Sequence, residues 1–171
     1  MRAMGKTKQI ALCGILTAIA LALSYTERFI PVQLLIPLPG VKLGLANIVT
    51  LLTLALLGAR HAGTILLCRC VLGAVFGGGI TGLAFSLCGG FLALGIMATS
   101  QKSKRLSLYG VSILGAAGHS VGQILAAMVL MRSVYVAAYL PWLLVVSVAT
   151  GSLTAMLCAS VLRSLPKEDR L

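Results

Sequence analysis

Apolar runs of about 20 residues, repeated along the whole chain, constrain the fold of this sequence more than any other feature. A helix that crosses the hydrocarbon core of a bilayer needs about 20 consecutive, mostly apolar residues. Six segments meet or approach that length, at 9–29, 41–58, 61–79, 80–99, 108–131 and 136–165. We therefore predict an all-α integral membrane protein, with residues 1–171 forming a single membrane domain that is a six-transmembrane-helix bundle.

The composition excludes soluble folds. Hydrophobic residues make up 59% of the 171 residues and charged residues only 10%, whereas about a quarter of the residues in a soluble domain are charged. The net charge of +11 does not indicate nucleic-acid binding, because the basic residues lie between apolar runs and form no basic face. The lipid bilayer is the expected environment, and no nucleic acid is expected as a partner.

The positions of the basic residues predict the orientation of the bundle. With the N-terminus inside, ten lysines and arginines fall on the inner face and three, Arg28, Lys42 and Arg132, on the outer face. An excess of this kind marks the cytoplasmic side, so we expect both termini in the cytoplasm. The first span also has the basic flank and the length of a signal peptide, with Ala22-Leu23-Ser24 as an alternative cleavage site. The charge asymmetry favours keeping all six spans.

Acidic and metal-ligating residues are too scarce for most enzyme chemistry. The acids are Glu27, Glu168 and Asp169, and the five cysteines all fall inside predicted spans without a C-x-x-C spacing. We therefore expect no metal site, no cofactor and no catalytic residues. The sequence contains no G-x-x-x-x-G-K-[ST] motif, so any ATP-driven step needs another subunit.

Arg69 is the most costly residue in the predicted spans. It lies about 12 Å from the inner face at 1.5 Å per residue, close to the middle of the membrane, where arginine costs about 2.5–3.5 kcal/mol. Glu27, the one acid in any span, is placed about 13 Å further out by the same rise, so a direct pair is not expected. An anionic ligand could balance Arg69, and the alternative is that helix-end carbonyls and water satisfy it.

Other polar residues are predicted at similar depths in the outer half of the membrane. His119 and Gln123 are one turn apart and share a helix face. We predict a substrate pocket that opens to the outside, formed by Arg69, Asn47, Ser86, His119 and Gln123, with Glu27 and Lys42 at its mouth. Residues 30–40, which combine three prolines with apolar side chains, are expected to cover this mouth as a lid, or else to rest on the lipid.

Small residues recur every four positions in several spans. On the first span they are Gly14, Ala18 and Ala22. Such spacing lets helix backbones approach closely where lipid provides no hydrophobic drive for association. It indicates either packing within the bundle or docking of a membrane partner against the first helix.

Three stretches of the sequence carry a resemblance to a known family. The run Lys42-Leu43-Gly44-Leu45-Ala46-Asn47-Ile48 after Pro39-Gly40, Arg69 with the glycines after it, and Gly115 to Gln123 resemble the bacterial Gx transporter family, also labelled heptaprenyl diphosphate synthase component I. Ser120 stands where that family usually has asparagine, which weakens any role assigned to this side chain. The resemblance covers nearly the whole chain.

The resemblance implies a function. The family is similar to the substrate-binding S-components of energy-coupling factor (ECF) vitamin transporters, which are six-helix proteins of the bacterial cytoplasmic membrane. By this likeness the chain captures a small anionic solute, such as a vitamin, flavin or quinone or prenyl precursor. Its first helix would dock, through Gly14, Ala18 and Ala22, to an energising transmembrane subunit that works with ATPases.

Two alternatives remain open. The chain could be a non-catalytic membrane subunit associated with polyprenyl diphosphate synthesis or with a membrane redox assembly. It lacks the aspartate-rich motifs by which prenyl diphosphate synthases hold magnesium and diphosphate, so we do not expect it to be the catalyst. A standalone channel would need a polar stripe through all depths, and the inner half of the predicted bundle shows none.

Overall fold

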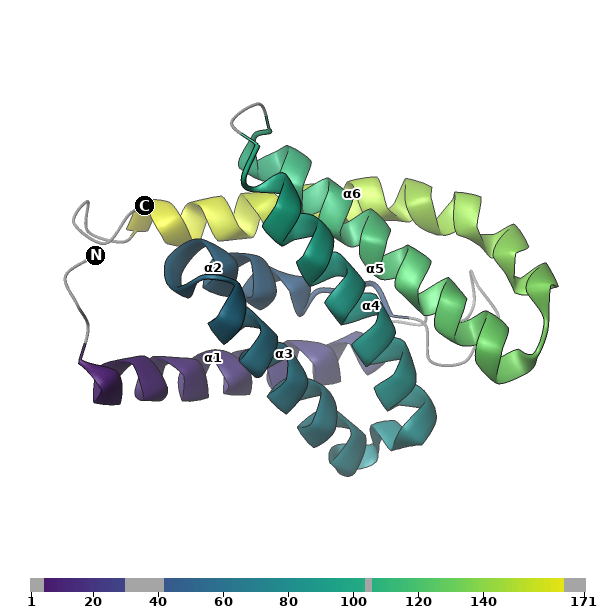
Figure 1. Cartoon of the computed structure of the whole chain (residues 1–171), viewed down its shortest axis with the longest axis horizontal. Coiled ribbons are helices and arrows are strands. Elements are labelled where there is room, and N and C mark those ends of the chain that lie inside the picture. The colour runs from purple at the N-terminus through teal and green to yellow at the C-terminus, as the bar shows by residue number, and fades with distance from the viewer. Residues whose placement is uncertain (1–4, 30–41, 104–105, 165–171) are drawn as a thin grey trace.

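The described part of the chain is helical throughout. The computed structural model describes residues 5–29, 42–103 and 106–164, and within these ranges there is no strand. The α-helices are α1 Lys6–Thr26, α2 Asn47–Leu57, α3 Ala59–Gly73, α4 Gly79–Ser100, α5 Leu108–Met131 and α6 Leu140–Ser164 (Figure 1). The short helical segments are η1 Glu27–Phe29, η3 Ala74–Gly78 and η4 Val134–Tyr139. The all-α prediction is confirmed, whereas the predicted lid lies outside the described residues.

Several of these helices are suited to a membrane. Among the described residues, four segments are long and apolar enough to cross one, namely Lys6–Thr26, Ala59–Ser100, Leu108–Met131 and Val134–Ser164. Helix α2 is also apolar but has 11 residues, which at 1.5 Å per residue is about 16 Å and less than a full crossing. The chain is therefore a multi-pass membrane protein. It crosses six times if α2 counts as one crossing and the 42-residue segment as two.

The 42-residue apolar segment is divided by a glycine-containing turn, close to the boundary predicted between the spans 61–79 and 80–99. Phe76 and Gly77 have non-helical backbone angles, and Gly77 and Gly79 have φ values of 96° and 62°. Glycine adopts positive φ without the steric cost that a Cβ imposes. The chain reverses here, so that α3 and α4 form two arms of a hairpin (Figure 1).

Helix α5 lies between α4 and α6 and packs closely on both. Its glycines make this approach possible, because a Cβ on Gly122 would lie 2.4 Å from the backbone oxygen of Cys88 on α4. On the other side of the molecule, α1 packs against α3 and α2. For α5, the predicted spacing of small residues therefore serves packing within the bundle.

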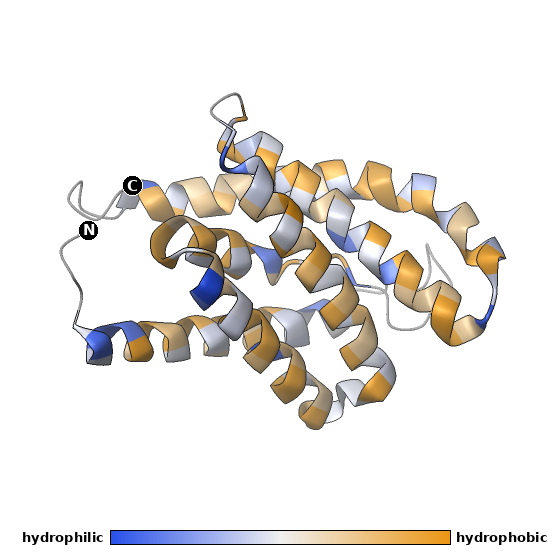
Figure 2. Cartoon of the chain, viewed as in Figure 1, coloured by the Kyte–Doolittle hydropathy of each residue, from blue (hydrophilic) through white to orange (hydrophobic). Residues whose placement is uncertain are grey.

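Large apolar side chains remain exposed along the outer faces of the helices. Ile10 is 73% exposed on α1, Ile80 is 85% exposed on α4 and Val129 is 77% exposed on α5. Figure 2 shows the same pattern, with hydrophobic colouring along most of each helix and hydrophilic colouring at the starts of α1 and α3. Water would not stabilise such a surface, whereas the hydrocarbon region of a bilayer does.

Candidate functional site

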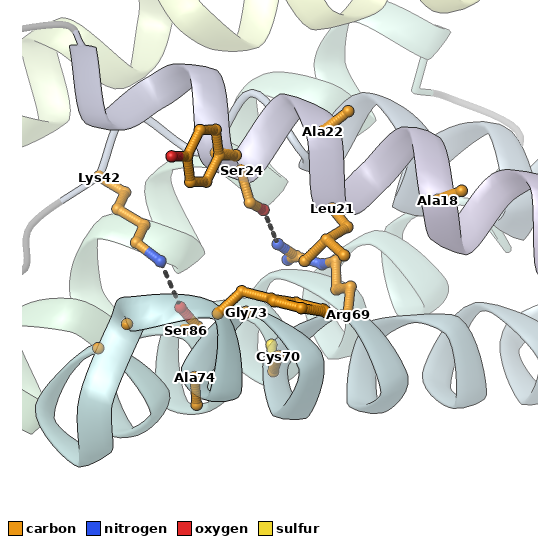
Figure 3. Close-up of a pocket in the computed structure, with 14 residues that line it drawn as sticks. Ala18, Leu21, Ala22, Ser24, Lys42, Arg69, Cys70, Gly73, Ala74 and Ser86 are labelled. Carbon is orange, nitrogen blue, oxygen red and sulfur yellow. Dashed lines mark hydrogen bonds between the residues drawn. The ribbon is translucent and has the colours of Figure 1, made fainter.

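A cavity of about 490 Å³ lies between α1, α3, η3 and α4. Its walls are mostly apolar or small side chains, and its polar groups come from four elements (Figure 3). The lining residues are Ala18, Leu21, Ala22, Ser24, Tyr25, Lys42, Arg69, Cys70, Gly73, Ala74, Phe76, Gly78, Gly82 and Ser86. This volume is within the range that binds small organic molecules.

Arg69 extends from α3 into this cavity and is 5% exposed. Its Nη1 donates a hydrogen bond of 3.1 Å to the Ser24 hydroxyl on α1 (Figure 3). Its Nε and Nη2 are buried and have no hydrogen-bond partner. A guanidinium has five N–H donors in a planar fork that matches a carboxylate or phosphate, so Arg69 retains donors for an anionic group.

Lys42 reaches the cavity from a different side than Arg69. Its Nζ donates a hydrogen bond of 2.9 Å to the Ser86 hydroxyl on α4, and its backbone N–H donates one of 3.3 Å to Gln123 Oε1 on α5. Figure 3 shows the Lys42–Ser86 and Arg69–Ser24 hydrogen bonds on separate sides of the pocket. The two cationic side chains therefore lie on different sides of the same small cavity.

Glu27 does not line the cavity. It is buried, and its Oε1 accepts the backbone N–H of Leu45. Glu27 and Arg69 interact electrostatically, yet no ion pair joins them in the described chain. The separation of Glu27 and Arg69 expected from the helical rise is too large, because the Arg69 guanidinium reaches Ser24. Ser24 precedes Glu27 by three residues, or about 4.5 Å of helix. Helix tilt and the long arginine side chain account for the difference.

His119 and Gln123 form a second polar group next to the cavity, and neither residue lines it. Both are buried, and their side chains are 2.8 Å apart between Gln123 Nε2 and His119 Nε2. Because Gln123 also accepts the backbone N–H of Lys42, this pair positions the segment that carries the cavity lysine. The structure thus separates residues that contact the cavity from residues that support it.

The segment from Lys42 to Asn47, which belongs to the run Lys42 to Ile48 described above, enters the interior of the bundle. Gly44 has a φ of 83°, and an added Cβ would lie 2.9 Å from Asn47 Nδ2 and 3.0 Å from His119 Cδ2. Asn47 is buried at the start of α2, and its backbone N–H donates to the Gly44 carbonyl at 2.8 Å. Gly44 therefore allows a turn and a close contact that a side chain would prevent.

The cavity brings together some of the predicted binding residues. Arg69, Lys42 and Ser86 line it, whereas Asn47, His119, Gln123 and Glu27 lie outside its lining. Of the predicted docking residues, Ala18 and Ala22 line the cavity, and Gly14 is exposed with open space around it.

Three lining residues that carry a hydroxyl or thiol, Ser24, Tyr25 and Cys70, were not among the predicted binding residues. For α1 a signal existed, because the lining residues Ala18, Leu21, Ala22 and Tyr25 follow the i, i+3, i+4, i+7 spacing of one helix face. Ser24 and Cys70 stood in apolar stretches with no motif to distinguish them.

The arrangement is suited to binding an anion. Two cationic side chains and two serine hydroxyls lie in a largely apolar cavity, where charge-assisted hydrogen bonds are strong. Within the described ranges no group of three or more histidine, cysteine or acidic residues could hold a metal ion.

Comparison with known proteins gives one match. The model of the family described as heptaprenyl diphosphate synthase component I matches residues 16–161. No curated protein and no solved structure matches the chain.

Proposed function

The chain belongs to the heptaprenyl diphosphate synthase component I family, and we propose that it is a membrane substrate-binding protein that captures a small anionic organic solute. Arg69 is the observation that carries the proposal. A buried arginine at membrane depth is costly, and this one lines a cavity large enough for a small molecule while two of its nitrogens have no hydrogen-bond partner among the described residues. An acid group bound there would provide the missing acceptors and the opposite charge.

The proposed topology has six crossings, with α2 and the segment that precedes it from Lys42 together forming the second. Both termini then lie in the cytoplasm of a bacterial cell. The start of α1 and the end of α6 lie at the same end of the bundle (Figure 1), as an even number of crossings requires. Basic residues begin α1 and α3 and end α6, namely Lys6, Lys8, Arg60 and Arg163. The positive-inside rule assigns that end to the cytoplasm. Lys42 then enters the cavity from the outer half of the membrane.

We propose that the chain itself is not an enzyme and takes no cofactor. Among the described residues, none that line the cavity has a carboxylate that could act as a general base or hold magnesium. Release of a tightly bound solute to the cytoplasm then needs energy from another protein, and an energising transmembrane subunit is the proposed partner. The exposed face of α1 with Gly14 and Ala18 offers it a surface of small residues.

The alternative function is that of a non-catalytic membrane subunit in polyprenyl diphosphate synthesis. The family's description names one component of a synthase and thereby implies a complex of several subunits. In that case the chain would co-purify with a soluble synthase and would show no uptake of solute into vesicles.

The proposal is tested with purified full-length protein in detergent and with matched acid and neutral ligands. Nicotinate is compared with nicotinamide, flavin mononucleotide with riboflavin, and dihydroxynaphthoate with its amide. We expect an acid to raise the melting temperature where its neutral analogue does not. Arg69→Gln should weaken binding of that acid about 10- to 100-fold, because charged hydrogen bonds contribute about 1.5–3 kcal/mol.

Arg60→Gln is the matched control, because Arg60 is exposed near the start of the same helix. It should leave the affinity unchanged. If Arg69→Gln binds the acid as tightly as the wild-type protein does, or if neutral analogues stabilise equally well, the proposed function is wrong.

A further inference from the structure

The cavity is polar at its buried end, which we call the floor, and apolar at its exposed opening, which we call the mouth. Ser24, Arg69, Cys70 and Ser86 at the floor are buried. At the mouth, Ala18 and Ala22 on α1 are exposed, Tyr25 is 51% exposed and Phe76 on η3 is 62% exposed. The polar groups thus lie inside and apolar groups surround the opening, which is the reverse of a pocket that opens to water.

The mouth lies at membrane depth. Ala18 and Ala22 are 12 and 16 residues after Lys6, the first residue of α1, or about 18–24 Å along the helix axis. The hydrocarbon core is about 30 Å thick. When α1 crosses the membrane, this side of the cavity therefore faces lipid chains.

We infer that the ligand is an amphiphilic acid dissolved in the bilayer, with its acidic group held between Arg69 and Lys42 and its apolar chain leaving the cavity between α1 and η3. This inference rests on the proposed function and specifies its substrate class. A carboxylate or a phosphate monoester suits the arginine fork equally well. The Ser24 and Ser86 hydroxyls, already fixed by the two cations, add hydrogen-bonding groups beside the acid.

The walls between floor and mouth are lined by small residues. Gly73, Ala74 and Gly82 leave a path for a slender chain along α3 and α4. A Cβ added at Gly82 would have no atom within 4 Å. A larger side chain at this position would therefore fill the cavity without disturbing the packing of the helix.

The same helix provides a matched control. Gly95 also lies inside α4, is exposed and has open space around an added Cβ, and it does not line the cavity. Replacing either glycine by leucine gives α4 the same gain in helix propensity. Gly82→Leu and Gly95→Leu should therefore have similar melting temperatures without ligand and differ only in ligand binding.

The experiment measures the thermal shift of the full chain in detergent with four probes. Oleate and oleyl phosphate carry both a chain and an acid, methyl oleate carries the chain alone, and butyrate carries the acid with almost no chain. We expect stabilisation by oleate, by oleyl phosphate or by both, and the stronger of the two identifies the head group. Gly82→Leu should abolish this shift, Gly95→Leu should keep it, and Arg69→Gln should weaken binding about 10- to 100-fold.

The outcomes separate this inference from the proposed function. If butyrate or the water-soluble acids stabilise the protein as strongly as oleate, the proposed function stands and the amphiphile is wrong. If oleate binds equally well to the wild-type protein and to Gly82→Leu, the chain does not lie in this cavity and the inference is overturned. If no acid of either kind binds, both the proposed function and the inference fail. If methyl oleate matches oleate, the site recognises no acid, and both fail again.

Discussion

Replacing Arg69 by methionine should stabilise the ligand-free protein while abolishing its ligand binding. Methionine has a similar length, carries no charge and fits an apolar cavity wall. If Arg69 had only a structural role, replacing it would instead lower the free energy of unfolding of the bundle. The stability of this variant therefore tests why an arginine is present in the membrane interior.

The magnitude follows from the contacts of the guanidinium. Loss of the Nη1–Ser24 hydrogen bond costs about 2 kcal/mol, since its donor is charged. Removing the buried, unpartnered Nε and Nη2 gains about 2 kcal/mol for each. Loss of the attraction to Glu27 reduces this gain. We expect the free energy of unfolding to rise by about 1–2 kcal/mol, because an apolar side chain avoids the cost of burying a charge that has no ion-pair partner in the described chain.

The assay is unfolding of the purified full chain in SDS, followed by circular dichroism, with and without an acid ligand. Arg60→Met is the control, because Arg60 is exposed on the same helix and its replacement should change stability by less than about 0.5 kcal/mol. A loss of more than about 1 kcal/mol in ligand-free Arg69→Met would refute the reasoning. It would mean that the guanidinium holds α1 and α3 together and is not reserved for a ligand.

Three further predictions concern the helices that support the cavity. Gly122→Ala should lower the free energy of unfolding by about 1–3 kcal/mol in SDS titrations, since its Cβ would meet the backbone of α4, while Gly95→Ala should raise it slightly. Gly44→Ala should cost about 1–3 kcal/mol, because alanine is strained at a φ of 83°, and an unchanged unfolding midpoint would contradict this. Gln123→Leu removes two hydrogen bonds, to His119 and to the Lys42 backbone, and should weaken acid binding in thermal-shift titrations more than Ser112→Ala, a control on the same helix away from the cavity.

Much of the fold could be predicted from the sequence because a membrane-spanning helix is marked by a local run of apolar residues. Long apolar runs led to the helical bundle, and the predicted boundary between the spans 61–79 and 80–99 falls close to the turn between α3 and α4, where Gly77 has a positive φ. Helix lengths were less predictable. The span expected at 41–58 contains α2 at Asn47–Leu57, because Gly44 bends the preceding segment and the helix begins only after this bend.

The candidate site was predicted only in part. Arg69, Lys42 and Ser86, which we predicted to take part in a substrate pocket, line the cavity. His119 and Gln123 share the predicted face, yet that face supports Lys42 from behind. Depth along a helix gives one coordinate of a side chain, whereas contact with a cavity depends on how each helix is rotated and tilted. These two quantities are set by packing against neighbouring helices.

The amino-acid sequence alone indicates that this chain lies in a membrane, that its helices are apolar and carry small residues at spacings suited to close packing, and that Arg69 has no acidic partner nearby on its own helix. These properties follow from composition and spacing, which act over short stretches of chain. The three-dimensional arrangement of the helices was needed to show that Ser24 binds one nitrogen of Arg69 and that the cavity opens beside α1. The hydrogen bond joins residues 45 positions apart, and the cavity lining runs from Ala18 to Ser86. Local sequence patterns do not encode how helices so far apart in the chain cross.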